Sequence, residues 1–177
     1  MRKLWFVLGI LLLGIVLLGL VGCSGNGVIP EPPPEIPLEL IREYTEYDYV
    51  QRWADGVISI YDETSFEGLQ GILDKVNTAI DGPVVFQLSE DPNSQIKVIF
   101  EELVYGSSIV HMELNDVGEL KNVLIRIDPS TAGYSVYLQA FLVSLSIDLS
   151  KSDQGITQEV STVLYWLYRL EPLYPLY

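Results

Sequence analysis

The 177-residue sequence is poor in the residue types that build disulfides, metal centres and reactive nucleophiles: it contains one cysteine, one histidine and two methionines. With Cys23 alone, no disulfide can form within the chain, so the fold must be stabilised by its core. With His111 alone, a zinc site made of three histidines is excluded, and no Ser–His–Asp arrangement is recognisable. We expect His111 to be an ordinary strand residue, because as a metal ligand it would need carboxylates such as Glu113 beside it.

Positive charge is scarce as well. The chain has 10 Lys and Arg against 24 Asp and Glu, which gives a formal net charge of −14. A chain of this charge is repelled by nucleic acid, so we expect no nucleic-acid partner, and the simplest role of the charge is solubility. The neighbouring carboxylates Glu101 and Glu102 point to opposite faces of a strand and therefore do not form a facing acid–base pair.

The longest apolar run lies at the N-terminus. It covers residues 4–21, follows Arg2 and Lys3, and ends in "LVGCSGNG", where small residues precede Cys23. This ending resembles the lipobox of bacterial lipoproteins, in which a peptidase cuts before the cysteine and the cysteine carries the lipids. The resemblance implies a lipoprotein signal peptide over residues 1–22, lipidation at Cys23, and an extracytoplasmic protein that is lipid-anchored to the cell membrane or outer membrane. An uncleaved membrane anchor is the alternative.

The chain after Cys23 divides into three parts. Five prolines lie between residues 30 and 37, which predicts an extended Pro-rich tether over residues 23–45. A domain follows over residues 46–171, and residues 172–177 form a C-terminal tail. Loss of Arg2 and Lys3 with the leader takes the formal charge of the mature chain to about −16.

Hydrophobic periodicity predicts the elements of the domain. After a turn at residues 53–56 we expect strands over residues 57–61, 83–90, 95–103, 107–114 and 120–128. We expect helices over residues 64–82, 132–147 and 156–170, the first capped by Thr64 or Ser65, and a loop over residues 148–155. A helix after the first strand permits a crossover, and so a mixed sheet with helices packed on it.

The order of these segments resembles a matrixin-type metzincin metallopeptidase domain between Tyr49 and Leu170. The counterparts are the turn at Trp53, residues 77–79, 84–86 and 96–100, the strand "NVLIRIDPS" and the helix "ITQEVSTVLYWLYRL". The resemblance implies an α/β (α+β) fold, with a metzincin-like twisted mixed sheet of about five strands packed with three helices.

The zinc motif of that family is lost. The family carries HExxHxxGxxH on the helix that follows the strand, where two histidines one turn apart hold zinc and the glutamate activates water. In the segment "LQAFLVSLSIDL" these positions are occupied by Gln139, Ala140, Val143, Ser146 and Leu149. None of them is a zinc ligand or general base of the family, and its methionine turn is missing too, so this helix is free to become a buried core element.

Two further patterns each have a functional and a structural interpretation. Asp148, Ser150, Ser152 and Glu159 partly follow a calcium loop, but the place that needs glycine holds Asp153, and helix capping near Thr157 is the simpler explanation. Aromatic residues gather near both ends of the domain and would form a binding patch if the ends meet: Tyr49, Trp53, Tyr165, Trp166 and Tyr168. Packing of the tail and tether onto the domain is the alternative.

These features predict no catalytic residue, no metal and no cofactor. We expect a pseudoenzyme: a non-catalytic cell-envelope lipoprotein with a degenerate metallopeptidase-like domain that binds or scaffolds. Its partners would be the membrane, through the lipid on Cys23, and a protein or glycan ligand. The alternative is a zinc-dependent peptidase-family protein with residual or unrecognised hydrolase activity.

Overall fold

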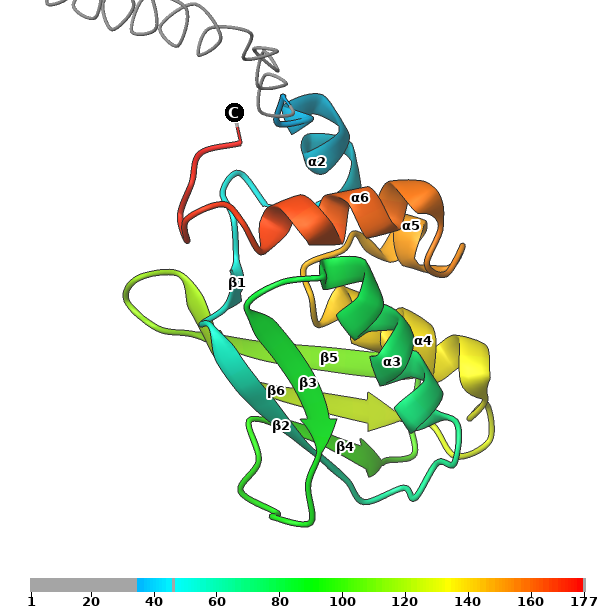
Figure 1. Cartoon of the computed structure of the whole chain (residues 1–177). Coiled ribbons are helices and arrows are strands. Elements are labelled where there is room, and N and C mark those ends of the chain that lie inside the picture. The colour runs from blue at the N-terminus through cyan, green and yellow to red at the C-terminus, as the bar shows by residue number, and fades with distance from the viewer. Residues whose placement is uncertain (1–34, 46, 177) are drawn as a thin grey trace, which may run out of the picture. The chain divides into compact units, whose positions relative to one another are not determined.

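The computed structural model describes residues 35–45 and 47–176. The fold described below is that of the compact unit that begins at Ile36 (Figure 1). The predicted signal peptide, Cys23 and most of the predicted tether lie outside the described residues. Among the residues that are described, no helix has the length and apolar character needed to cross a membrane.

A mixed six-stranded sheet forms one layer of the domain (Figure 1). Its main strands are β2 (Gly56–Asp62), β3 (Val84–Leu88), β4 (Ile96–Phe100), β5 (Ser108–Leu114) and β6 (Glu119–Ile127). Across the sheet they lie in the order β3, β2, β4, β6, β5; the first four are parallel, and β5 is antiparallel to β6. The predicted α/β class with a mixed sheet is therefore confirmed.

A sixth strand replaces part of the predicted turn at residues 53–56. Strand β1 (Arg52–Trp53) pairs in parallel with the start of β6, and its Trp53 side chain is fully buried. The connection between the two strands is therefore shorter than the predicted turn, because Trp53 belongs to β1 and Gly56 begins β2. The sheet has six strands rather than five because a two-residue strand is too short to produce an alternating pattern.

Five helices are present in the described residues, two more than predicted. Helices α3 (Leu69–Ile80), α4 (Tyr134–Val143) and α6 (Gln158–Leu167) correspond to the predicted three. Helix α5 (Leu149–Ser152) lies within the predicted loop, where the Asp148 carboxylate accepts a hydrogen bond from Ser150 N and caps its first turn.

Helix α2 (Leu38–Tyr44) corrects the predicted boundary of the tether at residue 45. It begins directly after Pro37, a residue that suits the entry to a helix but was counted with the tether prolines. Ile41 and Tyr44 are buried, and α2 contacts α6. Residues 36–45 therefore belong to the folded unit.

The start of α3 also differs from prediction. Thr64 and Ser65 were expected to cap a helix there, but the helix begins at Leu69, and Gly68 at its N-cap provides no side-chain bond. Instead the Asp62 carboxylate accepts hydrogen bonds from Thr64 N and Phe66 N, both at 2.9 Å. Because Asp62 satisfies these amides at the end of β2, the chain forms a turn before the helix starts.

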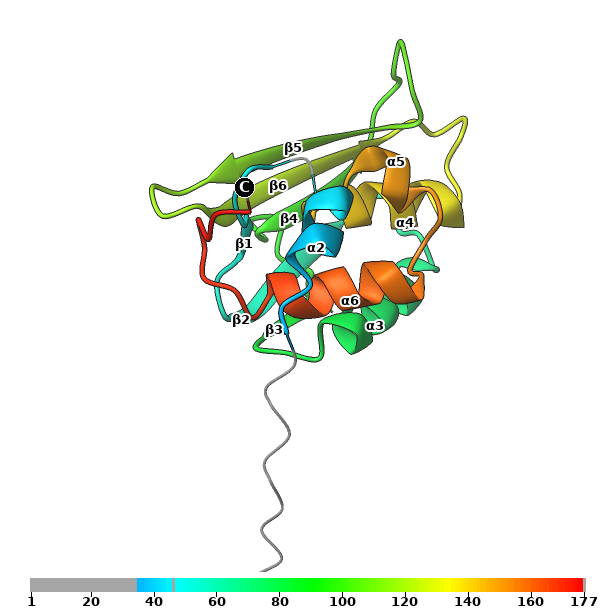
Figure 2. The ribbon, with the colours of Figure 1, turned by 90° about the horizontal axis from the view of Figure 1, so that it is seen from above.

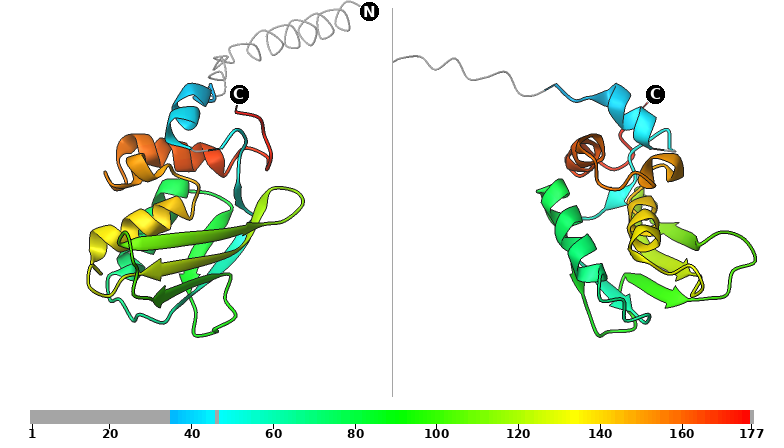
Figure 3. Two further views of the ribbon diagram at one scale, coloured as in Figure 1. Left: turned by 180° about the vertical axis from the view of Figure 1, so that it is seen from behind. Right: turned by 90° about the vertical axis from the view of Figure 1, so that its right-hand side faces the viewer.

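The core lies between one face of the sheet and the helices. Alternate residues of β2, β3, β4 and β6 are buried beneath α3 and α4, which lie on the same side of the sheet (Figure 3). The ring of Phe86 on β3 packs edge-on against Phe141 of α4, with ring centroids 5.4 Å apart. No helix of the described part covers the opposite face, which carries half-exposed apolar and polar side chains.

The predicted C-terminal tail packs on the domain. Val50 N donates to Tyr174 O at 3.0 Å, and Leu176 N donates to Asp48 O at 2.8 Å. Leu176 is fully buried. Residues 172–176 are therefore part of the same folded unit as the domain.

Asp128 holds together the two loops that lead into β5 and α4. Its carboxylate accepts hydrogen bonds from Leu103 N at 2.9 Å and from Ser130 N at 2.8 Å, while its own N–H donates to Ser107 O at 3.0 Å. These hydrogen bonds lower the pKa of the Asp128 carboxyl below its ordinary value. The bond from the Ser130 hydroxyl has the largest effect, and the bond from the Leu103 amide comes next.

We predict that Asp128→Asn lowers the free energy of unfolding and that this loss depends on pH. The folded-state pKa of Asp128 is lowered, so its contribution is present above the unfolded carboxyl pKa of about 3.9 and is lost as the pH falls through the folded-state value. Urea unfolding of wild type and variant across acidic pH should show the difference shrinking below about pH 4. Asp116→Asn, in the exposed β5–β6 hairpin, is the matched control, and an equal loss in both variants would contradict the role of Asp128.

Candidate functional site

Helix α4 follows the last parallel strand, β6, at the place where the resemblance puts the zinc-binding helix. Gly133 and the Asp128 turn set its start, and it contacts α3, α5, β5 and β6. Tyr137 anchors its first turn: its ring stacks on Phe66 with centroids 4.1 Å apart, and its hydroxyl donates to Thr64 Oγ1 at 2.5 Å. Burial raises the pKa of this Tyr137 hydroxyl.

The five positions matched to the zinc motif lie in three environments. Gln139 and Val143 are half-buried, one turn apart on α4, and Ala140 is 1% exposed. Ser146 lies beyond the end of the helix, 3% exposed, and its hydroxyl donates to Gln51 O at 3.2 Å. Leu149 opens α5 and is 56% exposed. The structure therefore brings only Gln139, Ala140 and Val143 together on one helix.

Ser146 marks the turn of the chain after α4. Its φ of 69° is in the left-handed region, which non-glycine residues seldom adopt. The resemblance assigns a glycine to this position, and glycine is the residue that takes this conformation most readily. In this chain the turn is held by the buried hydroxyl of Ser146 and by Ile147 N, which donates to Leu142 O at 3.2 Å.

The residues at these positions do not fit a zinc ion. The side chains of Val143 and Leu149 have no atom that can coordinate a metal, and Gln139 offers only a neutral amide. Across the described part of the chain, no three His, Cys, Asp or Glu side chains come together in a way that could hold a metal. His111 and Glu113 lie on β5, and the Glu113 carboxylate accepts from Asn122 Nδ2 at 2.9 Å.

The calcium-like positions serve as helix caps and local contacts. Asp148 caps α5, and the buried Ser152 donates its hydroxyl hydrogen to Leu149 O at 2.8 Å. Thr157 caps α6 by accepting from Val160 N at 3.2 Å, as the capping interpretation predicted. Glu159 lies in the first turn of α6, where hydrogen bonds from its own backbone amide and from the Thr157 hydroxyl lower its pKa.

The predicted aromatic patch is not one surface. Trp53 is fully buried and Tyr168 is 2% exposed, so neither can meet a ligand. Tyr165 and Trp166 pack edge to face with centroids 5.6 Å apart, and the Arg169 guanidinium lies 3.3 Å from the centroid of the Tyr165 ring. Tyr49 is bridged instead to the tail at Pro175. The patch fails because periodicity places a side chain on a helix face but does not tell which face another segment covers.

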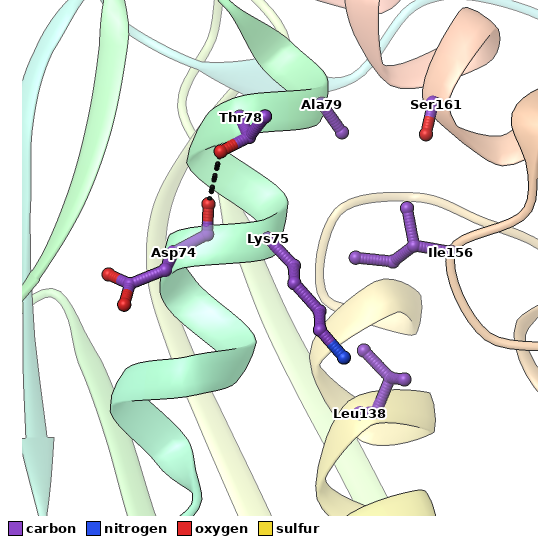
Figure 4. Close-up of a pocket in the computed structure, with 7 residues that line it drawn as sticks. All are labelled: Asp74, Lys75, Thr78, Ala79, Leu138, Ile156 and Ser161. Atoms are coloured by element: carbon purple, nitrogen blue, oxygen red, sulfur yellow. Dashed lines mark hydrogen bonds between the residues drawn. The ribbon is translucent and has the colours of Figure 1, made fainter.

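A pocket of about 400 Å³ lies between α3, α4 and α6 (Figure 4). The apolar side chains of Leu138, Ile156 and Ala79 line it, and Lys75 reaches across it (Figure 4). Lys75 Nζ donates to the Tyr134 hydroxyl at 2.8 Å. The pocket can accept a small apolar group, but its lining offers no nucleophile–base pair.

This pocket could not be predicted from the sequence because its residues come from segments that are far apart in the chain. Lys75 and Ala79 share one side of α3, but Leu138 and Ile156 are brought to them only by tertiary packing. No local signal in the sequence predicts that meeting.

We predict a graded response when aspartate is placed at three of the positions matched to the zinc motif. Ala140→Asp puts a charge in the core and should cost several kcal/mol, Val143→Asp about 1–3 kcal/mol, and Leu149→Asp less than about 0.5 kcal/mol. Urea unfolding of the three variants measures this order. The half-burial of Val143 makes its expected cost smaller than that of a fully buried packing site. Equal and small losses would mean that α4 faces open solvent.

Comparisons with known proteins give only distant structural likeness. No family model matches the chain, and a search of curated proteins finds no match. Among solved structures, that of myroilysin, a metallopeptidase, is similar with a TM-score of 0.34 and 12% sequence identity, over 61% of this chain. This chain covers 53% of that chain, about half of its length. A likeness at this TM-score carries no argument about the fold or the function of this chain, and no residue of this chain takes a role from it.

Proposed function

We propose that this chain is a non-catalytic lipoprotein of the cell envelope, whose degenerate metallopeptidase-like domain binds or scaffolds rather than cleaves. Lipid on Cys23 would attach it to the cell membrane or outer membrane, with the domain outside the cytoplasm. The ligand would be a protein or a glycan.

The environment of α4 is the observation that carries this proposal. A hydrolytic zinc site needs ligand atoms at Gln139, Val143 and Leu149 and a carboxylate at Ala140. In place of the carboxylate, the Ala140 methyl is packed in the core, and Leu149 points to solvent at the start of another helix. Restoring a site would therefore require new side chains at all of these positions.

The surface of the domain supports binding more than chemistry. The pocket beside Lys75 is lined by the apolar side chains of Ala79, Leu138 and Ile156 and by the polar residues Asp74, Lys75, Thr78 and Ser161, which suits a small group with an apolar body and hydrogen-bonding atoms. Lys75 Nζ already donates a hydrogen bond to the Tyr134 hydroxyl, so a ligand would have to share or replace that hydrogen bond. No observation favours a residual hydrolase over a binding domain.

We predict that the purified full-length chain contains no stoichiometric zinc and does not cleave peptides. Metal analysis by mass spectrometry, together with a peptidase assay with and without a chelator, measures both. One zinc ion per chain with chelator-sensitive cleavage would establish the hydrolase alternative instead.

The membrane attachment has its own test. Mass spectrometry of the mature protein should find an N-terminus at Cys23 with diacylglycerol on its sulfur, and Cys23→Ala should leave the precursor uncleaved. Ser24→Ala, at the next position, is the control and should be processed normally. A mature protein that still begins at Met1 would contradict the lipoprotein assignment while leaving the non-catalytic domain untouched.

A further inference from the structure

The sheet has two outer edges, and one of them is protected. On β3, Ser89 N donates to Ile60 O of β2, so the backbone groups of Phe86 and Leu88 point outward by alternation. The Asn77 side chain meets Phe86 there: its Nδ2 donates to Phe86 O at 2.9 Å and its Oδ1 accepts from Phe86 N at 2.8 Å. The Asn77 side chain thus satisfies the outward N–H and C=O groups of Phe86 and prevents another strand from pairing with the middle of β3.

The other edge, β5, has no such protection. Asp128 N donates to Ser107 O, which makes residues 107 and 128 a hydrogen-bonded pair of the antiparallel ladder. By alternation the N–H and C=O groups of Ser108, Val110 and Met112 point away from β6. None of these groups has a hydrogen-bond partner in the described part of the chain. The strand has seven residues and no proline, and it runs along the outer margin of the sheet in Figure 2.

We propose that β5 is the interface between two copies of this chain, which pair antiparallel about a twofold axis with Val110 opposite Val110 of the partner subunit. The strand is already antiparallel to β6, and antiparallel pairing is the more stable kind. About a twofold axis, β5 of one subunit pairs with β5 of the other. The outward N–H and C=O groups of both strands are then satisfied by the same set of hydrogen bonds. The two sheets join into one continuous sheet. The pairing does not involve Cys23 and is independent of the function proposed above.

The charges on β5 allow a self-contact even though the chain as a whole has a net charge of −14. Strand β5 has one carboxylate, Glu113, and in the proposed register it lies opposite residue 107, an uncharged serine. Ile109 then faces His111 of the partner subunit. The side chains on the helix side of the strand, Ser108, Val110 and Met112, carry no charge, so no like charges are opposed.

Amide hydrogen exchange of the full chain in detergent, followed by NMR, tests the interface. The Val110 and Met112 amides should become protected as the protein concentration rises about a hundredfold, because association follows mass action. The His111 amide, which bonds to β6, should be protected throughout and serves as the internal control. Sedimentation under the same conditions should show a monomer converting to a dimer.

Two proline variants sharpen the test. Val110→Pro removes only an outward N–H, which an edge strand tolerates, and should leave a monomer in which His111 stays protected. Leu88→Pro makes the same change on the protected edge and should leave the dimer unchanged. Rapid exchange of Met112 at every concentration would overturn the proposal, and so would concentration-independent protection in a monomer. The wild-type measurement decides the matter even where Val110→Pro does not fold.

Discussion

The burial of helix α4 is the constraint on which the rest of this domain depends. Between Tyr137 and Val143 the helix has a single polar side chain, Gln139, and a helix that is apolar all round must be covered on several sides. Strands β5 and β6, together with α3 and α5, provide that cover. Helix α4 is therefore a packed element of the core.

A few polar side chains fix where the elements begin and end. Asp62 accepts backbone hydrogen bonds at the end of β2, so that α3 begins later in the chain. Asp128 connects the loop before β5 to the loop before α4. Asn77 connects α3 to the edge of β3. Each uses a side-chain oxygen or amide to satisfy backbone groups that the regular elements leave open. The two edges of the sheet differ in this respect. Asn77 satisfies the outward backbone groups of Phe86 on β3, whereas the outward backbone groups of β5 have no partner in the described residues.

Local patterns in the sequence were enough to predict the main elements but not the contacts between them. The apolar alternation of β2 and the three-and-four spacing of α3 were visible, and both elements lie close to their predicted positions. Helix α2 was missed because it follows a run of prolines, and the burial of Trp53 and Tyr168 was missed because it depends on distant segments. The hydrogen bond from Leu103 N to Asp128 spans 25 residues, and no local spacing in the sequence predicts it.

The most direct test of the filled site is thermal unfolding of the full chain with added zinc and with a chelator. A metal that binds the native state raises the melting temperature, and zinc at about 100 times its dissociation constant would stabilise by about 2.7 kcal/mol. For a domain of this size that is a rise of roughly 5–10 °C. We predict the same melting temperature under both conditions. A rise in zinc that the chelator reverses would contradict the account, because it would require a native metal site.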